Sequence, residues 1–279
     1  MKNFEVAESF YNNRYENCQG SNFFVEDEVL YSYGHHFPVA MYIGDYVLLN
    51  GDAYSPSTST HQSYIRQVVL KRLQIIIPFS ALYRAIGERS NYDKIKVIDN
   101  TPSTNIPYTY TDKHGEEKTG YRHTLGGSVF EYEGRYFISG IDETGVKNLY
   151  FLTELVRPVV SFEDALEALK PDVVIEAEKN DVEVKRQGEW FFIKLEKLGF
   201  SDYIIIKDGK LPGNDNDTGH HIVSELIQKN NYCIVRGIVK HDRKEHKQLK
   251  LYDDVKNKKW WTVVHNEQVQ SWSADGNVD

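Results

Sequence analysis

Three histidines lie near a run of hydroxyl side chains in the N-terminal part of the chain. His35 and His36 follow a strand-like segment, and His61 directly follows the polar run Ser55–Thr60. A helix N-terminus offers unpaired N–H groups and a partial positive charge, so hydroxyls beside a histidine there suit a phosphate or another anion. We therefore predict a site in which His35, His36 and His61 are the catalytic groups. Its predicted binding residues are Tyr31, Tyr33, Tyr54, Ser57, Thr58, Ser59 and Thr60.

A structural role accounts for the same residues without any ligand. Serine and threonine are common helix caps, and they would cap the helix that this run begins. Tyrosines that alternate along a strand are typical of a half-buried sheet. Both interpretations of this segment stay open.

A second group of histidines lies near the C-terminal end of the chain. Catalytic zinc sites use three protein ligands and leave a fourth position open, so two or three of these histidines with a carboxylate such as Glu225 could bind zinc. The spacing HExxH is absent, and the alternative is that these are polar surface side chains. A metal site is thus a secondary hypothesis, and the leading expectation is that the protein has no cofactor. The candidate metal ligands are His220, His221, His241, His246 and His265.

Other common catalytic motifs are missing from the sequence. It contains no GxSxG, no GxxxxGK[ST] and no GxGxxG, which leaves serine-hydrolase, nucleoside-triphosphatase and dinucleotide chemistry without their signatures. Cys18 and Cys233 lie far apart, so no disulfide framework or four-cysteine zinc site is available. Cys233 stands in the apolar run NYCIVRGIV, where a buried, unreactive thiol is expected.

The charge balance bears on the class of partner. A formal net charge of −8 argues against a general nucleic-acid binder, since such proteins carry clustered Lys and Arg over a whole face. Nucleic acid is therefore not expected as a primary partner. The apolar runs are too short to span a bilayer, and the two cysteines suit a reducing compartment, so we expect no membrane anchor and a cytoplasmic location in the host cell.

The elements that position these residues form an α+β pattern with antiparallel sheets and a few short helices. The chain has 19 Tyr and 13 Phe but only 2 Met, a balance that favours strands. Apolar spacing predicts helices over residues 4–15, after the run 54–61, and over 80–86 and 218–228. Strands are expected within 23–50 and at 96–98, 182–185, 190–194, 203–206, 233–240, 249–252 and 260–265. Two hairpins are predicted, one protruding over 100–127 and one around Glu133-Gly134.

Two subdomains are expected. Ser161 and Asp164 form a capping-box pattern before an apolar helical spacing, and the character of the sequence changes near Arg157-Pro158. We place an N-terminal α+β domain at residues 1–158, a C-terminal α+β domain at 159–272 and a disordered tail at 273–279.

Two stretches of the sequence resemble known proteins. One is LYSYGHHFPVAMYIGDYVLLNGDAYSPSTSTHQSYIRQVV, and the other includes VKRQGEWFFI and VRGIVKHDRKEHKQLKL. Both are similar to segments of an uncharacterised family of phage-borne and plasmid-borne proteins for which no activity is known. The resemblance implies a mobile-element protein, and it transfers no catalytic residue.

The leading functional hypothesis is a phage or mobile-element accessory protein that binds a macromolecular partner. The expected partner is a host or phage protein. One form of this hypothesis is that the protein inhibits a host antiviral defence system. A homo-oligomer is also compatible with the sequence. Tyrosine combines apolar area with a hydroxyl and suits interfaces, so Tyr108 and Tyr110 on the protruding hairpin are predicted binding residues. The alternative is a metal- or histidine-dependent hydrolase or nuclease.

Overall fold

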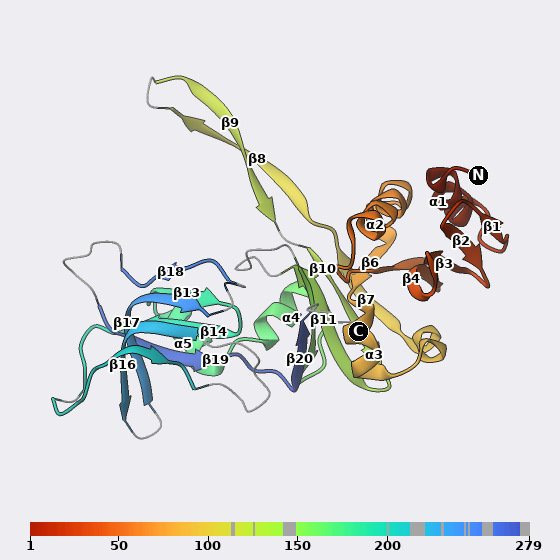
Figure 1. Cartoon of the computed structure of the whole chain (residues 1–279). Helices are drawn as coiled ribbons and strands as arrows, with labels where there is room; N and C mark the ends of the chain where they lie inside the picture. The colour runs from red at the N-terminus through yellow and green to blue at the C-terminus, as the bar shows by residue number, and fades with distance from the viewer. Residues whose placement is uncertain are drawn as a thin grey trace. The chain divides into compact units, whose positions relative to one another are not determined.

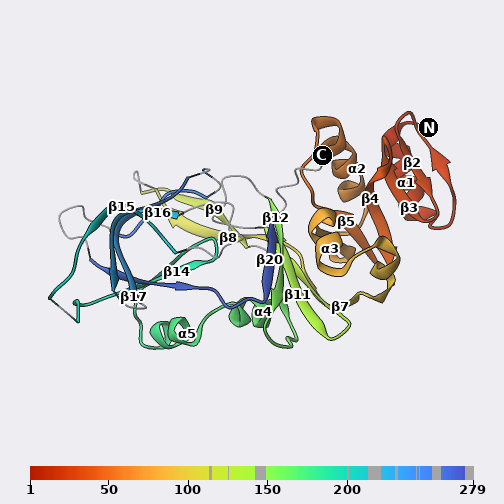
Figure 2. The same cartoon turned by 60° about the horizontal axis from the view of Figure 1, so that its bottom comes forward.

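The computed structural model describes residues 1–112, 115–124, 126–141, 149–199, 201–212, 221–229, 232–242, 244, 246–252 and 259–273 (Figures 1 and 2). The chain divides into two compact units. Unit 1 contains Met1–Ile141, Leu149–Leu166 and the segment that begins at Gln268, whereas unit 2 contains Glu167–Glu267. Each unit has its own sheets and its own core, and each is described by itself below.

Unit 1 is built around a six-stranded sheet in the order β1-β2-β3-β4-β5-β6. The first five strands form an antiparallel meander, and four of them, β2 to β5, are the strands predicted within 23–50. Strands β5 and β6 are parallel because the helix α2 connects them. The strands are β1 (Cys18–Gln19), β2 (Phe23–Glu26), β3 (Val29–Ser32), β4 (Gly34–Ile43), β5 (Tyr46–Asn50) and β6 (Gln74–Ile77).

Side chains on alternate positions of this sheet enter two different cores. Val47 and Leu49 of β5 pack with helices α1 (Asn3–Asn12) and α2 (Pro56–Val68), whereas Leu48 packs on the opposite face. That alternation is the two-residue period of a strand that is buried on both faces. Val6, Ala7 and Phe10 are the buried stripe of α1, which confirms the predicted N-terminal helix.

The opposite face of the sheet, on which Leu48 lies, carries the helix α3 (Phe79–Ile86). A second, five-stranded antiparallel sheet packs on this face as well, and its residues Phe130, Phe137 and Leu152 belong to the same core as Leu48. Two short 3-10 turns, η1 (Lys71–Leu73) and η2 (Arg89–Lys94), flank β6 and α3. The order in the second sheet is β20-β12-β11-β10-β7, with β7 (Lys96–Thr101), β10 (Gly127–Tyr132), β11 (Arg135–Ile141), β12 (Tyr150–Leu155) and β20 (Gln270–Ser273).

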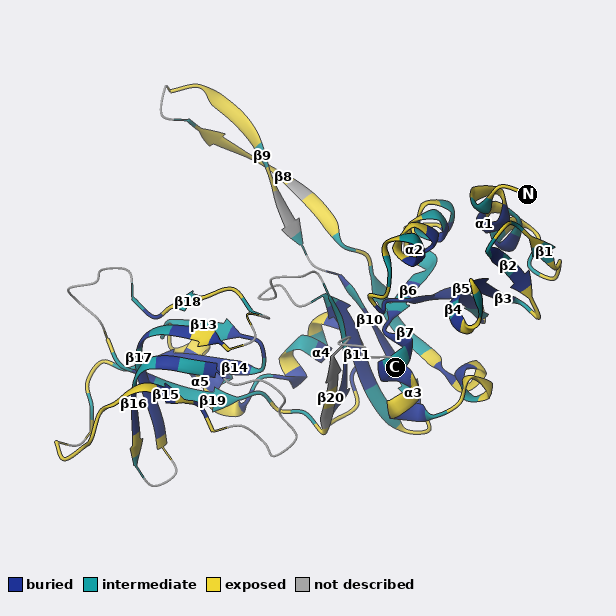
Figure 3. Cartoon of the chain, viewed as in Figure 1, coloured by how far each residue is buried: buried dark blue, intermediate teal, exposed yellow. Residues whose placement is uncertain are grey.

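The predicted hairpin within 100–127 is present as β8 (Thr104–Thr111) and β9 (Glu117–Thr124). In the part of the chain that the structure describes, these two strands pair only with each other. Figure 3 shows that much of the hairpin is exposed on both strands. An isolated two-stranded ribbon buries little apolar surface and is marginally stable in water.

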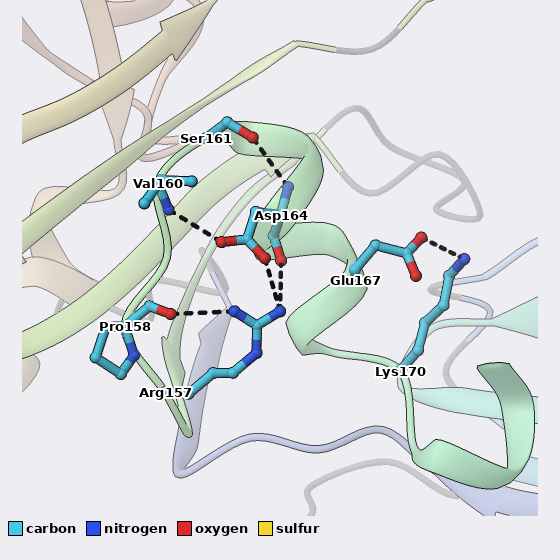
Figure 4. Close-up of polar contacts among 7 residues, drawn as sticks. All are labelled: Arg157, Pro158, Val160, Ser161, Asp164, Glu167 and Lys170. Carbon is cyan, nitrogen blue, oxygen red and sulfur yellow. Dashed lines mark hydrogen bonds and ion pairs between the residues drawn. The ribbon is translucent and has the colours of Figure 1, made fainter.

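The helix α4 (Phe162–Ala168) follows the predicted capping box (Figure 4). The backbone N–H of Asp164 donates to Ser161 Oγ over 3.1 Å, and the Asp164 carboxylate accepts from the N–H of Val160 and from Arg157. The guanidinium of Arg157 lowers the pKa of Asp164. At the other end of the helix, Lys170 pairs with Glu167 at 2.7 Å.

Unit 2 is an antiparallel sheet with one helix, α5 (Asp172–Lys179), on one face. Phe191 and Ile193 of β14 pack against α5, whereas Trp190 and Phe192 belong to the main core on the other face. The path is β13-β14-β19-β17-β16-β15, and β18 pairs with β17. The strands are β13 (Val184–Gln187), β14 (Trp190–Lys194), β15 (Ile206–Lys210), β16 (His221–Lys229), β17 (Tyr232–His241), β18 (Leu249–Lys250) and β19 (Trp261–His265).

The α+β prediction is confirmed, and several local predictions are corrected. The helix predicted over 218–228 is wrong, because residues 221–229 form the strand β16. The strand predicted at 203–206 begins only at Ile206. Ser273 of the predicted tail ends β20, and residues 274–279 lie outside the described residues. Across the described ranges, no helix has the length and apolar composition needed to cross a membrane.

Candidate functional site

Three of the five predicted metal ligands converge in unit 2. One ring nitrogen from each of His221, His241 and His246 can be chosen so that all three lie within 4.8 Å of one another. The rings contact one another, with centroid distances of 4.9 Å for His221 and His241 and 5.3 Å for His221 and His246. We call this group the histidine cluster. Nitrogen ligands on one tetrahedral zinc ion lie about 3.4 Å apart, so the three nitrogens would have to move closer together to hold one ion.

The first two members are positioned by the pairing of β16 with β17. His221 and His241 are direct cross-strand partners, so their side chains share one face of the sheet. Val223 and Val239 are the next residues on that face, and both belong to the main core of unit 2. The cluster is therefore an extension of the core at the end of this strand pair.

A β-bulge sets this register. Val223 pairs with Val239, but Glu225 pairs with Arg236, so β17 has one more residue than β16 between the two pairs. Gly237 lies in this interval at φ 102°, a conformation that glycine adopts without strain. If the full-length strand paired without this bulge, the ladder from Glu225 and Arg236 would place Lys240 opposite His221.

The third member is held beside the tight turn between β13 and β14. Gly188 in this turn has φ 57°, and a Cβ atom placed there would lie 2.8 Å from His246 Nε2. Gln187, next to it, donates a short hydrogen bond to the carbonyl of Lys247. Glycine thus serves two purposes at position 188, because it permits the turn and leaves room for the His246 ring.

Burial controls the charge of the cluster. His221 is 2% exposed, and burial together with the neighbouring His241 and His246 lowers its pKa to about 3. Its ring is therefore neutral near pH 7, the form in which histidine binds metals. His221 Nε2 is buried, and the described residues supply it with no hydrogen-bond partner. A buried polar atom of this kind is costly unless a water, an ion or another group satisfies it.

Two carboxylates surround the cluster. Glu189 Oε1 lies 3.8 Å from His221 Nδ1, and Asp242 Oδ1 lies 3.9 Å from His241 Nδ1. The Glu189 side chain is about a quarter exposed and His246 is half-buried, so this side of the cluster communicates with solvent. Trp190 closes another side, with its ring 6.4 Å from the His221 ring.

The other predicted metal ligands have different positions. His220 lies outside the described residues. His265 pairs with Trp190 across β14 and β19, and its Nδ1 lies 3.0 Å from the Asn266 carbonyl, so it is a neighbour of the cluster and not a member. Glu225 forms an ion pair with Arg236 and takes no part in the cluster.

The first predicted site is divided by the structure. Tyr31, His35 and His36 line a cleft of about 840 Å³ in unit 1. His35 Nε2 lies 2.6 Å from Glu26 Oε2, and its ring contacts Tyr31 edge-on. His61 is absent from the lining of this cleft: it is buried between Phe23 and Tyr33, with its ring nitrogens 2.7 Å from Ser32 Oγ and 3.0 Å from Asn3 Nδ2.

The hydroxyl run serves the start of α2. Ser55 is the N-cap and accepts from the backbone N–H of Thr58. Ser57 Oγ and Thr58 Oγ1 lie within 3.1 Å of Ser55 Oγ, and Thr60 donates to the carbonyl of Pro56, whereas Ser59 is exposed. Tyr54 is exposed and packs on Phe37.

The hairpin tyrosines lie together on β8. Tyr108 and Tyr110 are both exposed, with ring centroids 5.9 Å apart, and Tyr121 on β9 is exposed as well. These side chains give the hairpin an aromatic surface.

Sequence reasoning overlooked several residues at both places. Glu189 and Trp190 border the histidine cluster. Gly188-Glu189, between the segment VEVKRQ and the apolar run WFFI, was the available signal for a tight hairpin at this point. In the cleft it overlooked residues from three further segments: Asp52, Ser80, Arg84, Arg89 and Tyr92. Comparison of the chain with protein-family models, with curated proteins and with solved structures finds no match.

Proposed function

We propose that unit 2 is a metal-dependent hydrolase in which His221, His241 and His246 bind one divalent transition-metal ion. The observation that carries this proposal is the convergence of three histidine nitrogens within 4.8 Å of one another. Two of the imidazoles come from the strands β16 and β17, and the third comes from the segment that follows β17. A set of three histidine ligands is typical of a catalytic zinc site. Structural zinc sites use four protein ligands, commonly with cysteine, whereas catalytic sites use three and keep a position for water.

The surroundings favour hydrolysis. A bound zinc ion would supply a water whose pKa is near 7 and would polarise a carbonyl or phosphoryl oxygen. Glu189 Oε1 lies 3.8 Å from His221 Nδ1, and its partial exposure suits a group that accepts a proton from that water and passes it to solvent. Asp242, beside His241 Nδ1, suits the second role that metal sites need, because it would orient the imidazole.

The nature of the ligands restricts the metal. Neutral imidazoles prefer zinc, cobalt, nickel and copper ions over magnesium and calcium, which favour oxygen ligands. Zinc is the expected metal, because the three ligands are all histidines and none of them is redox-active.

The hydrolase proposal is tested with metal-loaded protein and two chromogenic probes, a p-nitrophenyl carboxylate ester and a bis-p-nitrophenyl phosphodiester. Hydrolysis of at least one probe should stop when a chelator removes the metal and return when zinc is added. Glu189→Gln should retain the metal and lower the rate by about a hundredfold, the loss typical of a missing general base. A metal-loaded protein that hydrolyses neither probe, or equal rates with and without metal, would refute hydrolysis.

The hairpin supports a second candidate function, binding of a macromolecular partner. The specific observation is the exposed aromatic surface formed by Tyr108, Tyr110 and Tyr121 on strands that pair only with each other in the described chain. A partner protein would cover these rings and stabilise the ribbon. An accessory protein of a phage or mobile element, including an inhibitor of host defence, fits this role.

This binding role is tested by replacing both β8 tyrosines with serine and comparing the proteins captured from a bacterial lysate. A stoichiometric partner that is captured by the wild type and lost with Tyr108→Ser/Tyr110→Ser supports the proposal. Tyr15→Ser, at an exposed tyrosine outside the hairpin, is the matched control. A partner captured equally by all three proteins would place the interface elsewhere.

A further inference from the structure

The cleft in unit 1 brings together four segments that are distant in sequence. It lies between the strands β3 and β4, the end of β5 with the residues that follow it, the helix α3 and the turn η2. Its volume of about 840 Å³ is within the range of small-molecule sites, which is roughly 300–1,000 Å³. All of its lining residues belong to unit 1, so the cleft is independent of the histidine cluster.

The floor of the cleft offers hydrogen-bonding groups. The Asp52 carboxylate is 6% exposed and accepts from the backbone N–H of Ser80 at 2.9 Å and from its hydroxyl at 2.6 Å. Together with Asn50, which accepts from the N–H of Phe79, it caps α3. Two ionised carboxylate oxygens provide about four acceptor positions, so capping leaves acceptor capacity on Asp52.

The walls of the cleft are aromatic. Tyr31, Phe37 and Tyr92 are buried there, and Tyr83 is 58% exposed at the rim. Tyr54 packs behind Phe37, with the two ring centroids 5.1 Å apart. Tyr31 already stacks on Phe24 inside the protein, whereas the exposed Tyr83 ring offers a face on which a planar ligand ring such as a nucleobase can stack.

Two arginines line the cleft. Arg84 and Arg89 lie there with His35 and His36, whereas Glu88 is an exposed carboxylate of the lining and Asp52 a buried one. Arg89 donates to the Tyr31 hydroxyl, which holds its guanidinium at the cleft. Guanidinium groups match phosphate in shape and charge, so the two arginines suit an anionic group of a ligand.

We propose that this cleft binds a nucleoside monophosphate. Each part of such a ligand has its counterpart: aromatic walls for the base, the Asp52 carboxylate for the hydroxyls of the ribose, and Arg84 with Arg89 for the phosphate. A ligand without the ring would lose the stacking contact with Tyr83, and a ligand without the phosphate would lose the contacts with the two guanidinium groups. Neither inorganic phosphate nor a nucleoside should therefore bind as well as the nucleotide.

The test is calorimetric titration of the full chain with AMP, GMP, CMP and UMP, with adenosine and inorganic phosphate as partial ligands. At least one monophosphate should bind with submillimolar affinity, at least tenfold more tightly than either partial ligand. Arg84→Ala and Arg89→Ala should each weaken binding about tenfold or more, because each removes charge-assisted hydrogen bonds to phosphate. Lys71→Ala, at an exposed cation outside the cleft, should leave the affinity unchanged.

Two further measurements make each result decisive. Repeating the titration with His246→Ala excludes binding of the phosphate to a metal ion in unit 2, and the affinity should not change. Thermal unfolding of the arginine variants confirms that they are folded. No binding of any monophosphate at millimolar concentration, equal affinity for inorganic phosphate, or equal affinity in Arg84→Ala and Arg89→Ala would overturn the proposal.

Discussion

His221 and His241 face each other directly across β16 and β17, in a register that is set by a β-bulge, which accommodates one extra residue in β17. The bulge beside Gly237 is the reason that a histidine and not Lys240 lies opposite His221. The histidine cluster, and with it the proposed metal site, therefore depends on a backbone feature several residues away from any ligand.

Deletion of Gly237 should leave metal binding intact, whereas Gly237→Val should weaken it. The deletion removes the extra residue, so a ladder without a bulge runs from the pair of Glu225 with Arg236 to the pair of His221 with His241. Valine keeps the strand at full length, but φ 102° and a Cβ 2.8 Å from the Ser224 Cβ oppose the bulged conformation, and pairing without the bulge would place Lys240 opposite His221. Circular dichroism of both variants checks that the sheet is formed. Loss of cobalt binding in the deletion variant, or full cobalt binding by Gly237→Val, would contradict this account of the register.

Gly188→Ala should weaken metal binding through His246. A methyl group at position 188 would lie 2.8 Å from His246 Nε2, so the ring must move, and φ 57° adds backbone strain. Gly134→Ala is the matched control, because that turn glycine also has positive φ but has no atom within 4 Å of the added Cβ. Both variants should lose about 1 kcal/mol of stability, and only Gly188→Ala should lose metal affinity. Equal metal affinities in the two variants would argue against His246 as a ligand.

Cys233 should react slowly with thiol reagents. Burial raises its pKa to about 11, so at pH 8 only about one molecule in a thousand carries the thiolate. Labelling the native protein with a disulfide reagent should modify the half-buried Cys18 first, and the second thiol should react only after unfolding. Mass spectrometry of the labelled peptides identifies the site. Rapid modification of Cys233 in the folded chain would contradict its burial in the core of unit 2.

Unit 1 should lose stability as the pH falls below about 6.5, the ordinary value for histidine. Burial lowers the pKa of His61, so between that lowered value and 6.5 the unfolded chain binds a proton that the folded chain does not. Protonation then favours unfolding, and the stability present above pH 6.5 is lost on acidification. Hydrogen exchange of α2 and β3 at pH 7.5 and 5.5 should report this loss. His61→Gln should reduce the pH dependence, and an unchanged dependence would point to other groups.

Much of unit 1 was predictable because its signals are local. The helical spacing of Phe4, Ala7, Phe10 and Tyr11 predicts the first helix, of which Ala7 and Phe10 are buried, and the serine at the N-cap of α2 precedes Pro56. The hairpin β8–β9 follows from polar strands around a turn. These features depend on residues close together in the sequence, which is where periodicity and capping are informative.

The helix predicted over 218–228 failed for a physical reason. Val223, Leu226 and Ile227 are all buried, and their spacing of three and four residues matches a helical stripe. In the structure the register shift between Val223 and Glu225 interrupts the two-residue alternation of a strand, so the pattern imitates a helix. The bulge that brings His221 opposite His241 is thus also the feature that concealed the strand.

The composition of the two sites was only partly accessible from the sequence. The histidines were recognised by type, but their convergence requires the pairing of β16 with β17 and the position of the segment that carries His246. Asp52 and Arg89 gave no signal of their own, because they meet in the cleft only after the β5–α2–β6 crossover and α3 have packed.

Cobalt titration of the chelator-treated protein tests the central claim most directly, since tetrahedral Co²⁺ has strong visible absorption and replaces zinc at histidine sites. The wild type should bind one Co²⁺ per chain with a tetrahedral spectrum. His221→Ala, His241→Ala and His246→Ala should each lose it, and His265→Ala, at the neighbouring histidine, should retain it. A wild type that binds no stoichiometric cobalt, or a spectrum that survives loss of any of the three cluster histidines, would contradict the metal site.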